Sequence, residues 1–377
     1  MTTHARIGVS SHDTARNDWV LNLPDHSPVT HGMLQLDVEI DNDCVVTAEP
    51  LLGSMHRGAE KLFESRDYRQ ILSLANRHEW TSAITGEIGV AQLIENELGI
   101  VLPETAAWLR TLLLEVQRIT SHLAFLAGYP WDDEVLNDQL RDSREVWVTH
   151  LQHFTGGRMH PMVTVFGGLS HAPSTQWLTE LKELALKSQT NLRNLSENFG
   201  QQLSTIPHNL GTLTIDDVTL FSLSGPIARA SGWQSDLRAQ WLTLKYHAVE
   251  SFTVTTAQTG DVATRLQLLL DEVLVSHSVV IECVEACLPI IDQPVNVLLP
   301  KVIRVPEGRY TSSIETPLGI AQWYLESRGD KYPYRLKLRP SSLHSILSLS
   351  HALKGVALDD VAKVVASLPF ICGDADR

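Results

Sequence analysis

A histidine before the first strand-like segment is one of the few residues whose type and place could carry chemistry. His31 lies between Thr30 and Gly32, and His26 is nearby. Because the unperturbed pKa of histidine is about 6.5, such a side chain can donate a proton near neutral pH. Taken alone, one loop histidine is more often a surface residue that makes an ordinary hydrogen bond.

A second cluster of charges lies at a predicted helix start, in residues 53–61. It contains His56, Arg57, Glu60 and Lys61. Arg57 could donate hydrogen bonds to an anionic group, and Glu60 and Lys61 could pair with neighbouring elements. The alternative is a solvated helix start whose salt bridges contribute little to stability.

A glycine-rich segment, residues 224–232, could bring backbone amides close to an anion such as a phosphate. It lacks the spacing of a nucleotide-binding fingerprint, and no lysine follows it as in a P-loop. We therefore interpret this segment, together with Asp236 and Arg238 that follow it, as a tight structural turn.

Histidine and cysteine spacing gives little support to a metal site. His150 and His153 stand three apart on a predicted helix, with His160 beyond, but no carboxylate motif accompanies them. The cysteines are scattered apart from one pair at a spacing of four: Cys44, Cys283, Cys287 and Cys372. Zinc and iron–sulfur sites need cysteine pairs that converge from two places. We expect the pair to pack in a helical core, without disulfides.

The elements that must position these residues form one cooperative α+β unit that is mainly helical. Residues 33–40 alternate apolar and polar side chains, and residues 44–48 resume a strand after a turn. Apolar residues then recur at three and four positions, which predicts a helical bundle. The expected helices lie within 53–154, 175–203, 261–288, 342–353 and 357–367, and further β segments lie within 244–256 and 312–339. We expect a polar leader, residues 1–19, before one domain, residues 20–377.

Composition describes an ordinary globular chain and excludes several functional classes. The 377 residues are 43% hydrophobic and 20% charged, and a net charge of -14 argues against a nucleic-acid surface. Polar residues interrupt each apolar stretch, so we expect no membrane-spanning helix and only peripheral membrane contact. Residues 1–22 are polar and unlike a signal peptide, so we expect the chain to stay in the cytoplasm.

Taken in order, motifs along residues 20–377 resemble the D subunit of bacterial complex I, the proton-pumping NADH-quinone oxidoreductase. The matching segments are residues 28–32, 55–61, 118–123, 156–160, 167–168, 224–232, 260–262, 333–339 and 373–377. Residues 55–80 look closest to the divergent second copies of actinobacteria. This family is similar to nickel-iron hydrogenase large subunits, so the resemblance implies their mainly helical α+β fold without the metal-site cysteines.

The resemblance implies a chain that is active only within a larger complex. It would form one wall of a quinone cavity against the small subunit that carries the terminal iron–sulfur cluster. Other peripheral-arm subunits and the membrane arm would be further partners. Electrons would pass from the cluster to quinone with coupled proton translocation, at the cytoplasmic face of the cell membrane. The chain itself would bind no metal, flavin or nucleic acid, and it has no dinucleotide fingerprint for NADH.

The resemblance also implies roles for individual residues. His31 matches the family histidine that hydrogen-bonds a quinone carbonyl, and Asp132 or Asp133 matches the acid behind that histidine. Arg57 and His160 match residues beside the terminal cluster. A cation there would raise the affinity of the anionic cluster for electrons.

One departure from the family pattern concerns the quinone site itself. Glu79 and Trp80 stand where an Asp-Tyr pair is usual. An indole donates one N–H bond but cannot supply a proton as a phenol can. We predict that His31 and Trp80 still hold a quinone. The alternatives are a structural or coupling subunit that has lost efficient quinone reduction, and an unrelated soluble α+β enzyme.

Nickel-iron chemistry has a sequence requirement that this chain does not meet. A nickel-iron site needs two separated Cys-x-x-Cys pairs. The sequence contains neither pair, and Cys372 stands alone near the place of the second. We therefore expect no hydrogenase activity.

Overall fold

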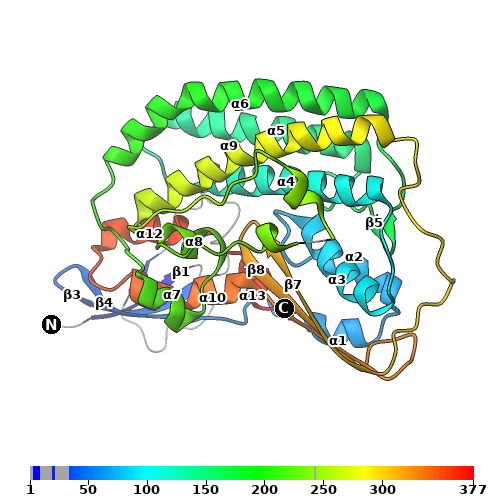
Figure 1. The fold of residues 1–377 in the computed structure, drawn as a ribbon. Helices are drawn as coiled ribbons and strands as arrows, with labels where there is room; N and C mark the ends of the chain where they lie inside the picture. Colours follow the sequence, from blue (N-terminus) through cyan, green and yellow to red (C-terminus); the bar gives the residue numbers. More distant parts are fainter. Residues whose placement is uncertain (1–2, 9–18, 22–33, 242) are drawn as a thin grey trace.

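Long helices form one layer of the molecule, above small sheets and short helices (Figure 1). The computed structural model describes residues 3–8, 19–21, 34–241 and 243–377. The expected α+β class, mainly α, is confirmed. The long helices are α4 (Glu104–Gly128), α5 (Glu134–Thr155), α6 (Thr175–Ser204) and α9 (Val262–Cys287).

Capping residues fix where these helices begin. The side chains of Asp133, Ser174 and Asp261 accept hydrogen bonds from backbone N–H groups in the first turns of α5, α6 and α9. Such bonds satisfy donors that a helix start otherwise leaves unpaired. Gly156 ends α5 in the left-handed conformation, which glycine adopts without a Cβ clash.

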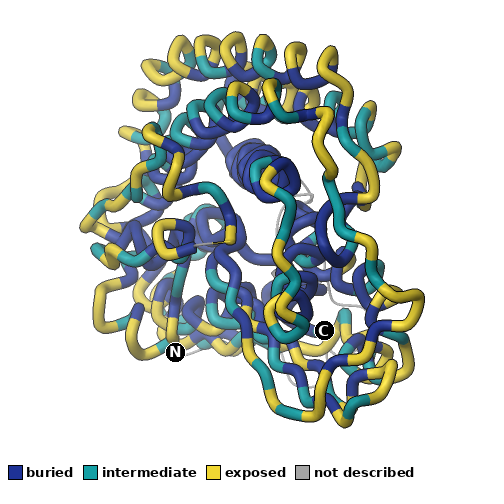
Figure 2. Tube along the Cα trace, turned by 45° about the vertical axis from the view of Figure 1, so that its right-hand side comes forward, coloured by how far each residue is buried: buried dark blue, intermediate teal, exposed yellow. Residues whose placement is uncertain are grey.

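The core lies where α4 and α9 pack against each other, with α5 and α6 outside them. Figure 2 shows exposed residues along the outer helices and loops, and buried residues in the middle of the molecule. With its last turn, α9 reaches Ile290 and is long and apolar enough to cross a membrane. We expected no such segment from the sequence. Because α9 packs on α4, α6 and α8, many of its apolar side chains serve the bundle core.

The N-terminal strands form a sheet in the order β2-β1-β3-β4. Leu36 and Val38 alternate with polar neighbours and bury their side chains on the core face. Asn42 and Asp43 have positive φ angles and make the tight turn between β3 and β4, which confirms the predicted hairpin. The strands are β1 (Thr3–Gly8), β2 (Trp19–Leu21), β3 (Gln35–Asp41) and β4 (Cys44–Leu51), so part of the expected leader belongs to this sheet.

A second sheet, β7-β8-β9, is antiparallel throughout and packs on α3 (Ala83–Glu97). Gly89 of α3 allows this approach, because a Cβ there would lie 2.6 Å from Nε1 of Trp323. Its strands are β7 (Gly308–Thr316), β8 (Gly319–Ser327) and β9 (Arg335–Arg339), and a two-stranded ribbon contains β5 (Thr164–Val165) and β6 (Gly168–Leu169).

The β segment predicted for residues 244–256 is wrong. This stretch contains a 3-10 turn, Lys245–Ala248, and no strand in its entirely described length. The alternation of apolar and polar residues in this stretch does not come from a strand. Leu244 and Tyr246 bury their side chains in the core and so attach the segment to it. The Lys245 backbone N–H donates to Thr111 of α4 at 2.9 Å, so the segment is pinned to that helix.

Short helices connect the layers and close the chain. They are α1 (Ala59–Glu64), α2 (Tyr68–Ala75), α3 (Ala83–Glu97), α7 (Ile215–Phe221), α8 (Gly225–Ala230), α10 (Ser341–Leu347), α11 (Leu349–Ala352), α12 (Val361–Ala366) and α13 (Cys372–Ala375). Asp67 and Gln70 form a reciprocal capping box at α2. The C-terminal α13 packs on α10, beneath the helical layer (Figure 1).

Candidate functional site

Trp80 lies in the turn between α2 and α3 and packs against the C-terminal tail. Its backbone N–H donates to the carbonyl of His78 at 3.1 Å, which tightens the turn. A Cβ at Gly373 would lie 2.5 Å from Cζ3 of the indole and 3.4 Å from Cε of Met55. The half-buried indole therefore rests on Gly373 beside Met55, and only a glycine fits beneath it.

The last residues of the chain clamp the loop that carries Met55. The Asp376 carboxylate accepts hydrogen bonds from the backbone N–H of Gly53 and of Met55, both at 2.8 Å. Nδ1 of His56 lies 2.7 Å from the Asp376 carbonyl oxygen. The loop, the tail and the Trp80 turn thus form one rigid wall, although the tail follows the loop by more than 300 residues in sequence.

Glu60 ties this wall to the second sheet. Its carboxylate pairs with Arg335 of β9 at 2.6 Å and with Arg377 at 3.1 Å. The predicted pairing of Glu60 with neighbouring elements is confirmed, whereas Lys61 pairs within its own helix, with Glu64 at 2.7 Å. These ion pairs border an open pocket of about 390 Å³.

A cationic group lies next to the wall. Arg57 is exposed and donates to the carbonyl of Arg77 at 3.2 Å. His160 lies near both arginines, and burial followed by the Arg77 and Arg57 charges lowers its pKa. The structure therefore brings Arg57 and His160 together, with His160 neutral at pH 7. His160 Nδ1 is buried and has no hydrogen-bond partner among the described residues.

Two buried carboxyl groups belong to the same wall. Glu79 accepts a hydrogen bond from the Ser82 hydroxyl, and Asp374 accepts one from the Ser342 hydroxyl at 2.8 Å. Burial, reinforced by the Asp374 charge, raises the pKa of Glu79 to about 8. Burial also raises the pKa of Asp374 to about 7. Each acid is the chain neighbour of a residue in the contact between Trp80 and the tail.

The other predicted site residues are His31 and Asp132 or Asp133. His31 and His26 belong to residues 22–33, which lie outside the described residues. Asp132 is exposed near the start of α5, and it makes no hydrogen bond or ion pair with any described residue. Asp133 instead caps α5 and accepts a bond from Asn198 at 2.9 Å.

The glycine-rich segment is mainly a short helix, α8, and not the tight turn that we predicted. Gly225 begins α8 with a φ of 65°, in the left-handed region, and its backbone packs so closely against Gly319 of β8 that a Cβ would clash. Arg229 within the segment is fully buried and pairs with Glu272 and Glu315, both at 2.8 Å. The segment is therefore part of the buried core.

The histidine and cysteine pairs also have structural roles. His150 stacks on Trp177, with ring centroids 4.7 Å apart and an interplanar angle of 21°. Cys283 and Cys287 are buried in the core without a disulfide, as expected. In the part of the chain that the structure describes, no three His, Cys, Asp or Glu side chains gather as they would around a metal ion.

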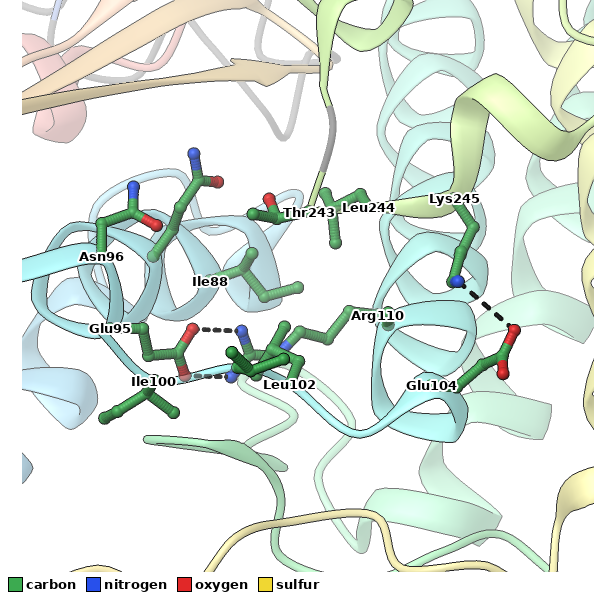
Figure 3. Close-up of a pocket in the computed structure, with 13 residues that line it drawn as sticks. Ile88, Glu95, Asn96, Ile100, Leu102, Glu104, Arg110, Thr243, Leu244 and Lys245 are labelled. Carbon is green, nitrogen blue, oxygen red and sulfur yellow. Dashed lines mark hydrogen bonds and ion pairs between the residues drawn. The ribbon is translucent and has the colours of Figure 1, made fainter. Parts of the chain in front are cut away.

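A separate pocket of about 410 Å³ lies between α3, α4 and residues 243–245 (Figure 3). Arg110 and Glu95 form a two-pronged ion pair in it, with both N···O distances at 2.7 Å. Lys245 reaches Glu104 at 3.4 Å (Figure 3). The charged side chains named here are paired with one another. Among the described residues that line this pocket, none is a site residue predicted from the sequence.

Sequence reasoning named Glu79 only as a departure from the family pattern, and it missed Asp374 and the charged network of the core. The network had a visible signal, because Glu115, Arg118 and His122 share one face of an otherwise apolar helix, and Glu272 lies in another. The burial of Asp374 had none, since it depends on how the tail folds back.

A family model and individual relatives both assign the chain to the same protein family. The model of the respiratory-chain NADH dehydrogenase 49 kDa subunit matches residues 139–303 and 295–377. A relative from Streptomyces griseus, named as the D 2 subunit of NADH-quinone oxidoreductase, is 38% identical, and the similarity covers 100% of this chain and 96% of the relative. The D 2 subunit of Salinispora arenicola is 40% identical over 96% of this chain and 94% of its own length.

More distant bacteria carry similar proteins. The D subunit of Carboxydothermus hydrogenoformans is 30% identical over 94% of this chain and 98% of its own length. The higher identity to the second copies of actinobacteria agrees with the resemblance seen in residues 55–80. The chain belongs to the 49 kDa subunit family of respiratory-chain NADH dehydrogenases, as a D subunit similar to those second copies.

Proposed function

We propose that this chain forms one wall of a quinone cavity, against an iron–sulfur small subunit whose terminal cluster passes electrons to the quinone. The observation that carries the proposal is the convergence of the Trp80 turn, the loop at residues 53–57 and the C-terminal tail, with Arg57 and His160 alongside. A rigid wall next to cations suits a substrate that accepts electrons from an anionic cluster.

In this proposal His31 and Trp80 hold the quinone head group. Quinone carbonyl oxygens gain negative charge as electrons arrive, and N–H donors at fixed positions stabilise that charge. His31 would also supply a proton, because a histidine titrates near neutral pH. Asp132 would orient the His31 ring by accepting its second N–H.

The cationic group would act on the partner's cluster. The charge comes from Arg57 and Arg77, because His160 is neutral at pH 7. A nearby cation stabilises the reduced, more negative cluster and raises its potential.

The chain would act at the cytoplasmic face of the cell membrane, as a peripheral subunit. Other peripheral-arm subunits would deliver electrons from NADH, and membrane-arm subunits would couple quinone reduction to proton translocation. Quinone is the substrate, and the iron–sulfur cluster belongs to the partner. A second candidate, a structural or coupling subunit without efficient quinone reduction, is favoured by one observation: Trp80 is bulkier than the usual tyrosine and packs tightly on Gly373.

Quinone reduction by the purified complex, with and without His31→Ala, tests the proposal. We expect the variant complex to assemble, to keep its iron–sulfur signals and to lose quinone reduction. Electron transfer to an artificial acceptor upstream of the quinone provides the control. Unchanged quinone reduction in His31→Ala, or no quinone binding by the parent complex, would favour the structural subunit.

A further inference from the structure

The source of one of the protons used in quinone reduction is not obvious at the wall around Trp80. Reducing a quinone to a quinol takes up two electrons and two protons, and an indole cannot supply an acidic proton. Resting on the proposed function, we propose that Glu79 and Asp374 together hold a proton beside Trp80 and deliver it to the quinone during reduction. The pair would thus replace the phenol that is usual at the place of Trp80.

The position of the two acids relative to Trp80 is the first support. Trp80 and Gly373 are in direct contact, and each is the chain neighbour of one of the acids. The two carboxyl groups are close enough for the charge of Asp374 to act on Glu79. Both side chains are buried, with residue exposures of 6% for Glu79 and 2% for Asp374. The acids therefore share one low-dielectric region beside the indole.

The surroundings of Glu79 suit a group that changes its protonation state. The hydroxyls of Ser82 and Thr316 lie within hydrogen-bond reach, and a hydroxyl can donate to a carboxylate or accept from an acid. The charge of Arg118 lowers the pKa of Glu79, against the larger effect of burial. Its guanidinium is already engaged by Glu115 at 3.3 Å, so it offsets the Glu79 charge only in part.

Asp374, like Glu79, has a hydroxyl group as a hydrogen-bond donor and no ion-pair partner among the described residues. Among the described residues its carboxylate accepts one hydrogen bond, from Ser342. Arg377 and Arg57 act on it electrostatically without forming an ion pair with it. Arg377 is committed to Glu60 at 3.1 Å, and Arg57 points to a backbone carbonyl.

A neighbouring acid shows what a fixed carboxylate looks like. Asp376, two residues further along the same tail, accepts backbone N–H bonds from Gly53 and Met55. Two backbone donors hold this carboxylate in place. In the described part of the chain, no backbone N–H donates to the Asp374 carboxylate. Burial raises its pKa and so favours the neutral form.

Reduction of the quinone to the quinol needs two protons, and two different groups supply them. The partner's iron–sulfur cluster delivers two electrons, one at a time, to the quinone. One carbonyl oxygen takes a proton from His31, and the other takes the proton of the acid pair. In that transfer the carboxylic O–H bond breaks, a quinol O–H bond forms and a carboxylate remains. Proton uptake from solvent then restores the acid, while Arg118, Arg57 and Arg377 offset its temporary charge.

Quinone reduction by the purified complex with Glu79→Gln or Asp374→Asn tests the inference, with a short-chain ubiquinone and a short-chain menaquinone as substrates. Glutamine keeps the shape of the protonated acid but cannot release a proton. We expect kcat to fall at least ~10-fold, with little change in KM, because general acids contribute roughly 100-fold or more. The fall of kcat on the alkaline side, near pH 8 in the parent, should also disappear.

A second substitution distinguishes proton supply from a structural role. Adding Trp80→Tyr to Glu79→Gln introduces a phenol that can supply the proton, so we expect most of the lost kcat to return. Glu87→Gln is the matched control. Glu87 is a buried acid with a raised pKa of about 7, but it is fixed by Asn76 and by backbone N–H groups near Thr164. Its substitution should leave the rate and the pH profile unchanged.

The possible failures are separable. A parent complex that binds no quinone, or a His31→Ala variant with full activity, would contradict the proposed function itself. A parent that depends on His31 while Glu79→Gln and Asp374→Asn keep its rate and pH profile would overturn only the proton-holding pair. Loss of activity in Glu79→Gln that Trp80→Tyr does not restore would likewise overturn it, in favour of a structural role.

Discussion

Two buried groups of charges in this molecule differ in how they are paired. In the core, Arg229 pairs with Glu272 and Glu315, both at 2.8 Å, and Arg238 pairs with Asp236 at 2.7 Å. This core network also includes Glu115, Arg118 and His122. In the wall around Trp80, Glu79 and Asp374 are equally buried but accept hydrogen bonds from hydroxyl groups.

One fold thus gives two kinds of surroundings to its buried acids. The arginine charges hold the pKa of Glu272 well below its usual range and lower that of Asp236, against the effect of burial. Glu315, which shares Arg229 with Glu272, is the exception, since burial raises its pKa. Hydroxyl partners do not offset burial in the wall, so those acids keep a proton near pH 7.

The largest expected effect comes from breaking the core network with Arg229→Met. The change leaves Glu272 and Glu315 without their cation, and removing one partner of a buried ion pair costs about 3–5 kcal/mol. Urea unfolding of the purified chain, or of its complex with the small subunit, gives the free energy. A loss below about 1 kcal/mol would mean that the network is not paired as described.

A smaller loss is expected when the wall is overpacked with Gly373→Ala. The added Cβ would lie 2.5 Å from the Trp80 ring, and overpacking typically costs about 1–3 kcal/mol. Gly200→Ala is the matched control, since Gly200 lies in α6 with no atom within 4 Å of its Cβ position. That change should stabilise by about 0.5–1 kcal/mol. Equal effects of the two substitutions on thermal unfolding would refute the close contact of Trp80 with Gly373.

The comparison also predicts opposite pH behaviour for the two groups of acids. The pKa of Glu79 is about 8 in the folded chain against 4.5 as the reference, and that of Asp374 is about 7 against 3.8. The folded chain therefore binds more protons than the unfolded chain as pH rises toward 8. Each acid should lower the unfolding free energy by up to about 1.4 kcal/mol per pH unit.

Unfolding measured between pH 6.5 and 8 tests this effect. Buried Glu87, whose pKa is raised to about 7, adds to the same slope, so the substitutions below identify the share of each wall acid. Buried His78, whose pKa is lowered to about 3, makes stability fall only as pH drops below about 6.5. We expect stability to fall with rising pH in the parent, and the slope to shrink in Glu79→Gln and in Asp374→Asn. A parent whose stability is flat over this range would contradict the protonated state of the wall.

The smallest effect on stability is expected for Arg57→Gln. Arg57 is exposed and makes one hydrogen bond, so the change in unfolding free energy should stay within about 0.5 kcal/mol. Its charge should still matter for the partner, since removing a cation lowers the potential of a nearby anionic cluster. A redox titration of the terminal cluster in the complex gives this potential. An unchanged midpoint would place Arg57 away from the cluster.

The sequence predicts the long helices well because their signals are local. The predicted ends 175–203 and 261–288 lie within a few residues of α6 and α9, whose starts are set by Ser174 and Asp261. Residues 244–256 were assigned wrongly because their apolar residues anchor to α4, a contact that is not local. A segment that buries every second residue without pairing to a strand shows the same sequence pattern as a β-strand.

The candidate site is predictable only in part, for the same reason. Family motifs singled out Trp80, Arg57 and His160, and the structure brings the last two together. The acid pair depends on the tail reaching a loop more than 300 residues earlier, as the Asp376 bonds to Gly53 and Met55 show. No spacing in the sequence encodes that contact.

The most direct test of a quinone site at this wall is photolabelling of the complex with a photoreactive quinone analogue, followed by peptide mass spectrometry. We expect labels on peptides that contain residues 53–57 and 76–82 of this chain, and excess quinone should prevent them. Labels that competition removes only from other subunits, or from distant segments such as α6, would contradict the account.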